Sequence, residues 1–131
     1  MEVTTHGAIE ARLCGEVREL SEGFALVELK TGTEMRTDER GLVHGGFLFG
    51  LADYAAMLAV NHPNVVLGSA QVRFLRPVRV GDTLIAEATL LDQEGNKKIV
   101  TVDVHRGEEV VLTGEFICFT PAQHVLHRSD S

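Results

Sequence analysis

Apolar residues occupy every second position in five stretches of the chain, which are 9–13, 70–74, 84–90, 100–104 and 110–118. A period of two predicts β-strands with one face toward a core and the other face outward. Turn-forming residues punctuate the chain at 21–23, 81–82, 94–96 and 106–107. We therefore expect the strands from about residue 68 onward to be antiparallel neighbours in chain order, as in a meander.

The segment from Gly46 to about Val60 has a helical pattern instead. It carries apolar residues on two faces, which are Phe47, Leu51, Tyr54 and Leu58 on one and Phe49, Ala52, Ala56 and Ala59 on the other. A helix that is apolar on nearly all sides is typical of a buried position. Pro63 ends the helix, because proline cannot continue it and disfavours helical geometry in the residue before it.

The predicted order is two strands, one helix and four strands. An α+β fold, in which a single antiparallel sheet wraps around one long buried central helix, satisfies this order and leaves a face that needs a partner. The 131 residues suffice for one domain, 1–131, and not for two. Residues 1–7 and 121–131 are expected to be flexible.

Composition excludes several classes of function. The net charge of -7, with 12 Lys and Arg against 19 Asp and Glu, opposes binding to nucleic acid. The longest apolar run, 47–60, is interrupted by an acid and is shorter than the roughly 20 residues of a membrane span. The chain has two cysteines, which do not form the dense pattern of a disulfide framework, and it shows no recognisable secretory leader. Both features favour a cytoplasmic protein with reduced thiols.

The acid inside the predicted helix is Asp53, and its position needs a physical reason. A lone carboxylate in an apolar site costs several kcal/mol unless it is paired, hydrogen-bonded or protonated. One interpretation is a structural acid that accepts hydrogen bonds across a subunit interface. The other is a functional acid with a perturbed pKa. The pattern alone leaves both open.

His44, Gly45 and Gly46 lie at the start of the predicted helix and favour the functional interpretation. Glycines allow close approach of a ligand, and the first N–H groups of a helix suit a carbonyl oxygen that becomes an oxyanion. Asp53 lies eight residues beyond Gly45, roughly 12 Å along the axis, which is too far for both to reach one carbonyl carbon. Two helices packed antiparallel across a two-fold axis would form two shared sites.

These motifs carry a resemblance to a known family. H-G-G-F-L-F-G-L-A-D, followed by S-A-Q-V-R-F-L-R-P-V-R-V-G-D-T-L, resembles the hotdog-fold acyl-CoA thioesterases of the phenylacetate-degradation type over about residues 20 to 120. The resemblance implies that Asp53 is the general base or nucleophile, that the Gly45 N–H of the other subunit holds the oxyanion, and that His44 organises the loop. It also implies a homodimer or a tetramer of two dimers.

Asp38 departs from the family pattern, because many relatives carry asparagine six residues before the motif histidine. An acid there could repel Asp53 or the leaving thiolate, so its effect on hydrolysis is an open question. The resemblance further implies that Gly46 and the segments 74–79 and 96–98 line the acyl-CoA channel. Within them we expect contacts to substrate from Phe74, Arg76, Pro77, Arg79, Lys97 and Lys98, although solvated charge remains an alternative for each cation.

Other chemistry is not expected. Cys14 and Cys118 fit small core residues of strands, and the His124-x-x-His127 spacing lacks further ligands, so no metal site is predicted. Coenzyme A would be part of the substrate, and no separate cofactor is expected. We expect the acyl-pocket walls to come from Phe47, Leu51, Tyr54 and the partner's strands.

Two alternatives to a thioesterase remain. One is a non-catalytic sensor of acyl-CoA or malonyl-CoA, because residues 70–119 also resemble the ligand domain of the malonyl-CoA-sensing repressor of fatty acid synthesis. The other is a hotdog hydratase or dehydratase. Those enzymes separate their Asp and His by four residues, whereas five residues separate Asp38 from His44.

Overall fold

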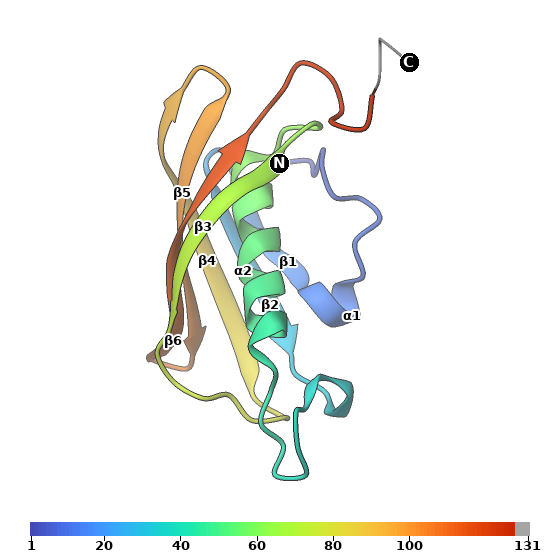
Figure 1. The fold of residues 1–131 in the computed structure, drawn as a ribbon, viewed down its shortest axis with the longest axis vertical. Coiled ribbons are helices and arrows are strands. Elements are labelled where there is room, and N and C mark those ends of the chain that lie inside the picture. The colour runs from blue at the N-terminus through green and yellow to red at the C-terminus, as the bar shows by residue number, and fades with distance from the viewer. Residues whose placement is uncertain (128–131) are drawn as a thin grey trace.

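A computed structural model, which describes residues 1–127, contains one six-stranded sheet wrapped around one long helix (Figure 1). The elements are α1 (Ala11–Cys14), β1 (Glu16–Ser21), β2 (Phe24–Lys30), the 3-10 helix η1 (Thr33–Met35), α2 (Gly45–Val60), β3 (Val66–Phe74), β4 (Thr83–Glu94), β5 (Lys97–Arg106) and β6 (Glu109–Phe119). The expected α+β architecture and order of two strands, a buried helix and four strands are confirmed. Within the described residues, no helix is long and apolar enough to cross a membrane.

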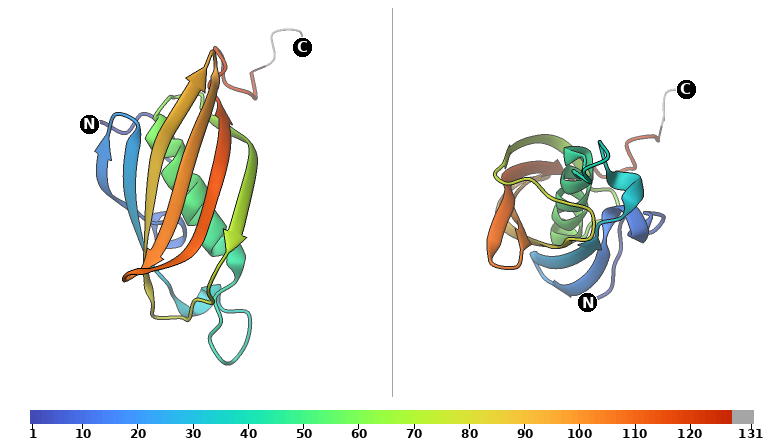
Figure 2. Two further views of the ribbon diagram at one scale, coloured as in Figure 1. Left: turned by 90° about the vertical axis from the view of Figure 1, so that its left-hand side faces the viewer. Right: turned by 90° about the horizontal axis from the view of Figure 1, so that it is seen from below.

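The sheet order is β1-β2-β4-β5-β6-β3, and every pair is antiparallel. The meander prediction is correct for β4, β5 and β6 but wrong for β3, which pairs with β6 and not with β4. One edge of β4 is occupied by β2 and the other by β5, so β3 cannot pair with β4 and instead extends the sheet at the edge of β6. The connector of residues 75–82 then carries the chain past the start of α2 to β4 (Figure 2).

The first strand is not where the alternation of residues 9–13 placed it. Ala11–Cys14 form one helical turn, in which the Cys14 N–H donates to the Glu10 carbonyl at 2.9 Å. Gly15 ends this turn with a φ of 110°, and β1 begins at Glu16. Five alternating residues are too few to distinguish a strand from a helical turn. Cys14 is therefore a half-buried residue at the end of α1.

Residues 1–7, for which we expect flexibility, include two residues that form hydrogen bonds with the end of α2. Asn61 ends the helix in the left-handed conformation. Its side-chain oxygen accepts from the Thr4 N–H at 2.9 Å, and its amide nitrogen donates to the Glu2 carbonyl at 2.8 Å. Pro121 accepts a hydrogen bond from Asn64, and residues 128–131 of the expected flexible tail lie outside the described part.

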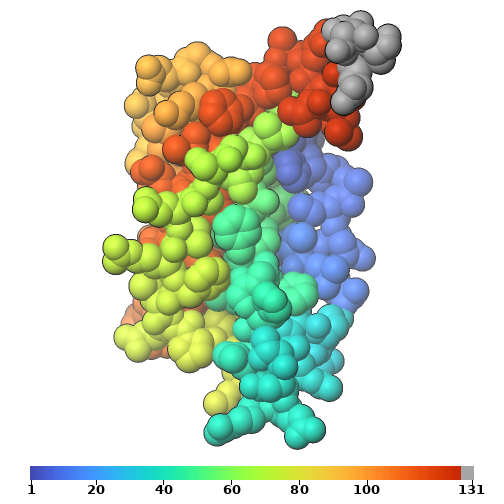
Figure 3. Space-filling view, viewed as in Figure 1, coloured from blue at the N-terminus to red at the C-terminus, as the bar shows by residue number. Residues whose placement is uncertain are grey.

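Helix α2 lies in the concave face of the sheet, and its apolar residues form most of its buried surface (Figure 2). Apart from Gly45 and Phe47 at the helix start, the residues that are not fully buried recur along one side, at Gly46, Phe49, Gly50, Asp53 and Val60. Spacings of three and four residues place them on one face, which we call the open stripe of α2. A Cβ added to Gly50 would meet nothing within 4 Å. Figure 3 shows the helix surface between β3 and the N-terminal segment.

Candidate active site

His44 organises the start of α2. It is the N-cap residue with an extended backbone, and its Nδ1 accepts from the Gly46 N–H at 2.7 Å. Its own N–H donates to the Met35 carbonyl at 2.8 Å, which joins the helix start to η1. Because Nδ1 is an acceptor, the neutral ring carries its proton on Nε2. The geometry fits the expected role of a loop organiser.

Gly45 is the first residue of the helix, and its N–H has no protein acceptor in the described chain, whereas the next N–H is held by His44. The residue lines an apolar groove of about 290 Å³. The groove is formed by Leu42, Val43, Gly45, Leu48, Phe74, Leu75, Arg76, Pro77 and Val78. A donor at the positive end of a helix, beside an apolar groove, suits a carbonyl oxygen that gains negative charge.

Asp53 lies two turns further along α2, on the open stripe. Its Oδ1 is shielded from solvent and has no hydrogen-bond partner among residues 1–127. Burial raises the pKa of the Asp53 carboxyl above its ordinary value. A carboxylate that is partly desolvated and unpaired is a stronger base than a solvated one.

The two thiols near Asp53 are disfavoured as nucleophiles. Burial, and then the charge of Asp53, raises the pKa of Cys118 to about 12. Burial is also the main cause of the raised pKa of Cys14, with smaller contributions from Asp53 and Glu10. Thiols with raised pKa values stay protonated near neutral pH, and a protonated thiol is a poor nucleophile. Asp53 is therefore the candidate reactive group of this cluster.

One chain does not bring Gly45 and Asp53 together. The helix rise separates them by roughly 12 Å along the axis. Gly45 opens into the apolar groove, and Asp53 does not line that groove. The two groups face different surroundings, as the sequence spacing predicts.

Asp38 lies in the loop before α2 and not beside Asp53. Its Oδ1 accepts from the Arg40 N–H at 3.0 Å and from the Leu42 N–H at 3.2 Å. It lines a second hollow of about 640 Å³, which we call the basic pocket. The basic pocket is formed by Asp38, Arg40, Leu42, Pro77, Val78, Arg79, Asp82 and Arg106. The Asp38 carboxylate thus shapes the loop at the mouth of this pocket.

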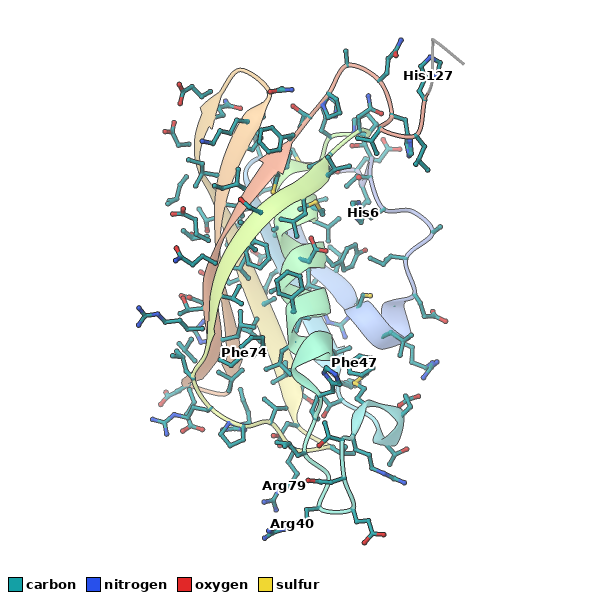
Figure 4. The ribbon with its side chains drawn as sticks, viewed as in Figure 1. His6, Arg40, Phe47, Phe74, Arg79 and His127 are labelled. Carbon is teal, nitrogen blue, oxygen red and sulfur yellow. The ribbon has the colours of Figure 1, made fainter. Side chains whose placement is uncertain are left out.

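The residues expected to contact substrate divide into two groups. Phe74, Arg76 and Pro77 line the apolar groove, and Pro77 and Arg79 line the basic pocket. The Phe74 ring lies beside Gly45, where its Cε1 would be 3.2 Å from an added Cβ (Figure 4). Gly46 is exposed in the first turn of α2. These residues gather around the helix start.

Lys97 and Lys98 form the second group, because neither lines a described pocket. They begin β5, and the Lys98 Nζ donates to the Gly95 carbonyl at 2.9 Å. Figure 1 shows the β4–β5 turn at the end of the molecule opposite the start of α2. The structure of one chain does not bring these lysines to the candidate site.

Phe47, Leu51 and Tyr54, which are expected to form walls of the acyl pocket, do not line the apolar groove of one chain. Leu51 is fully buried in the core, and Tyr54 is buried beside His6 of the N-terminal segment. Leu48, which sequence reasoning did not select, lines the groove instead. The helical pattern identified apolar faces but did not say which one meets the sheet.

Sequence reasoning also missed Arg40, Asp82 and Arg106. Arg106 donates to the Pro77 carbonyl at 2.7 Å and pairs with Asp82 at 3.2 Å and with Glu109 at 2.7 Å. In the sequence, Asp82 and Arg106 stand out only as members of turn motifs. The pocket assembles from three distant chain segments, so no local pattern marks it.

Comparisons with known structures support the fold. A crystal structure of an uncharacterized protein from Pyrococcus horikoshii is 57% identical, with a TM-score of 0.96, and covers 97% of this chain and 98% of that chain. An Asn-to-Asp variant of the phenylacetic acid degradation protein PaaI from Thermus thermophilus is 28% identical, with a TM-score of 0.76, over 83% of this chain and 95% of that one. The expected hotdog fold is confirmed.

Sequence comparisons give related matches. A family model described as the thioesterase superfamily matches residues 40–113. A methylthioribose-1-phosphate isomerase from Aquifex aeolicus (strain VF5) is 52% identical over 88% of this chain and 25% of its own length. Transcription factor FapR from Shouchella clausii (strain KSM-K16) is 33% identical over 80% of this chain and 56% of its own length. The chain therefore spans between a quarter and somewhat more than half of these curated relatives.

Proposed function

Because this chain belongs to the thioesterase superfamily, we propose that it hydrolyses the thioester of an acyl-CoA to the free acid and coenzyme A. The observation that carries the proposal is the unpaired, partly desolvated carboxylate of Asp53 on the open stripe of α2. Burying a carboxylate without a partner costs free energy, and a role in catalysis gives a reason for that cost.

The reaction uses two groups of the protein. The Gly45 N–H donates to the thioester carbonyl oxygen and stabilises the negative charge that develops there. Asp53 acts as a general base that takes a proton from water while the water oxygen bonds to the carbonyl carbon, or as a nucleophile that forms an anhydride which water then hydrolyses. The carbon–sulfur bond breaks, and the coenzyme A thiolate leaves and takes up a proton.

The site is completed by a second copy of the chain. Gly45 and Asp53 of one chain are too far apart along α2 to meet one carbonyl carbon. The open stripe leaves room for another helix, because nothing lies within 4 Å of the Cβ position of Gly50. Antiparallel packing of two copies across a two-fold axis brings Asp53 of each beside Gly45 of the other. We therefore propose a homodimer with two equivalent sites, alone or paired into a tetramer.

Asp53→Asn tests the proposal most simply. The substitution keeps the size of the side chain and removes its ability to act as a base or nucleophile. A panel of acyl-CoA thioesters, assayed for thiol release, should show wild-type hydrolysis and a loss of about 10² to 10⁴ in the variant. Acyl-CoA binding, measured by calorimetry, should persist. Retention of more than about a tenth of the wild-type rate would make Asp53 a structural acid.

A second candidate is a non-catalytic acyl-CoA sensor, which the likeness to Transcription factor FapR supports. The same two measurements separate the candidates. A sensor binds acyl-CoA without releasing thiol, so Asp53→Asn has no turnover to remove. An enzyme loses turnover and retains binding.

A further inference from the structure

The N-terminal segment of residues 2–14 runs along one side of α2, and we call it the N-terminal strap (Figures 1 and 3). One end is fixed at the end of the helix. There the Thr4 N–H donates to the Asn61 side-chain oxygen at 2.9 Å, and the Thr4 hydroxyl donates to the Asn61 carbonyl at 2.8 Å. At the other end, Arg12 of α1 pairs with Glu34 of η1. The strap is therefore held at both of its ends.

The strap and the glycine that follows it meet α2 at two residues that flank Asp53 in the sequence. The His6 ring lies beside the Tyr54 ring, with 6.3 Å between their centroids, and Figure 4 shows His6 on this side of the helix. Gly15 approaches Leu51 so closely that an added Cβ would lie 3.0 Å from the Leu51 Cδ1. The strap thus covers one side of the helical turn that carries Asp53.

The ionisable groups around this turn favour their neutral forms. Cys14 from α1 and Cys118 from β6 both sense the charge of Asp53, and burial is the main cause of their raised pKa values. Burial also raises the pKa of Tyr54 and lowers the pKa of His6. None of these four groups offers the Asp53 carboxylate a positive charge near neutral pH. Shielding from water therefore decides how strongly Asp53 holds a proton.

The strap is an addition to the part of the chain that the family shares, because it lies outside residues 40–113, which match the family model. Two half-buried apolar residues of the strap, Ile9 and Leu13, pack against the core. These anchors can be changed without altering α2 itself.

We propose that the N-terminal strap is a positioning element of the proposed reaction, because it keeps water from one side of the Asp53 carboxylate and makes this group a stronger base. This inference rests on the proposed function. A carboxylate that loses contact with water binds a proton more tightly, since its ionised form loses solvation. Tighter binding increases the driving force for taking a proton from water. Ile9 and Leu13 are positioning residues, which act only through Asp53.

The test variant combines Ile9→Ser with Leu13→Ser. The matched control combines Val17→Ser with Leu20→Ser, which changes two half-buried residues of β1 that also pack against the core. An NMR titration of the Asp53 carboxyl carbon, assigned by its absence from Asp53→Asn, measures the pKa of this group in each folded protein. We expect the pKa to be lower by about 0.5 or more in the test variant and to match the wild type in the control.

The pH profile of thioester hydrolysis is the second readout. The acid limb of kcat/KM follows the pKa of the essential base in the free enzyme, so it should move to lower pH by the same amount in the test variant. A strap with a merely structural role would lower the rate without moving this limb. An Asp53 pKa that is the same in the test variant, the control and the wild type would overturn the proposal.

If the test variant does not fold, Asn61→Gly takes its place under the same criteria. Glycine adopts the left-handed conformation that Asn61 has at the end of α2, and it lacks the side chain that binds Glu2 and Thr4. Asn64→Ala is then the matched control, because it removes a side-chain hydrogen bond to Pro121 at the same end of the helix.

The two readouts separate this proposal from the proposed function. If the wild type hydrolyses no acyl-CoA, the proposed function fails, and the titration alone decides whether the strap shields Asp53. A lower Asp53 pKa in the test variant than in the control then supports the shielding, and equal values overturn it.

Discussion

Asp53 combines two properties that a purely structural side chain would not need. Its Oδ1 is buried without a partner in the described chain, and burial raises the pKa of its carboxyl. Apolar residues surround it in α2, so an aliphatic or amide side chain would cost less. Proteins keep such destabilising groups at sites where activity requires them. The cost should be measurable as a pH-dependent free energy of unfolding.

Asp53→Asn should therefore stabilise the fold at neutral pH. The pKa of Asp53 is raised on folding from about 3.8, so the folded state disfavours the ionised form above that pH. The free-energy cost of burying the ionised carboxylate is absent below the pKa of Asp53 in the unfolded chain. It grows as pH rises toward the pKa of Asp53 in the folded protein, and it is constant above that value. We expect the variant to gain about 0.5–2 kcal/mol in denaturant unfolding at pH 7 and nothing at pH 3. Equal gains at both pH values would rule out the carboxylate as the source.

Asp38→Asn tests the departure from the family pattern. The asparagine side-chain oxygen can still accept from the Arg40 and Leu42 N–H groups, so the loop and the melting temperature should be preserved. Removing the negative charge should hold or raise the rate of thioester hydrolysis. Asp38→Ala is the matched control, because it removes both the charge and the acceptor. A hundredfold fall with asparagine, about 2.7 kcal/mol, would give Asp38 a catalytic role and favour the hydratase alternative.

At the scale of elements, local sequence patterns predicted some features well. Helix α2 begins one residue before the expected Gly46 and ends at Val60, as expected. These bounds were predictable because both signals, the apolar periodicity and the stop at Pro63, are local in the sequence. The pairing of β3 with β6 was not predicted, because it depends on which strand edges are free after the sheet assembles. The turn at Ala11–Cys14 was missed because a five-residue alternation is ambiguous.

The open stripe of α2 gives a prediction at this scale. Gly50 lies within the helix with nothing within 4 Å of its Cβ position, so Gly50→Leu should fit one chain and favour its helix. The added side chain should instead block a second helix that packs on the stripe. Sedimentation should show a folded monomer near 14.3 kDa, with hydrolysis lost. Gly50→Ala is the small-residue control, and an active Gly50→Leu dimer would mean that the interface lies elsewhere.

At the scale of the whole molecule, the sequence could predict the candidate residues of α2 better than the pocket beside them. The acid and the helix start were predicted from local motifs, and their separation along one helix led to the prediction of a second chain. The basic pocket was only partly predicted, since Arg79 was selected but Arg40 and Arg106 were not. These residues lie far apart in the sequence and meet only after β3 has crossed to β6. A pocket whose residues are brought together only by the order of the strands in the sheet has no local sequence pattern.

The central claim is that each site takes Asp53 from one chain and the Gly45 N–H from the other. Gly45→Pro removes that N–H, and proline is favoured at the first position of a helix. The extended backbone of His44 is also compatible with a following proline. Gly45→Ala adds a side chain but keeps the N–H, so it controls for crowding against Phe74. Asp53→Asn and Gly45→Pro should each be inactive as homodimers.

The most direct measurement is the hydrolysis rate of a purified heterodimer of these two variants, obtained by co-expression with different affinity tags. One of its two sites combines Asp53 of the Gly45→Pro chain with Gly45 of the Asp53→Asn chain, and the other site lacks both groups. We expect about half of the wild-type rate, because one of two equivalent sites is intact. A heterodimer as inactive as the two homodimers would contradict the shared site.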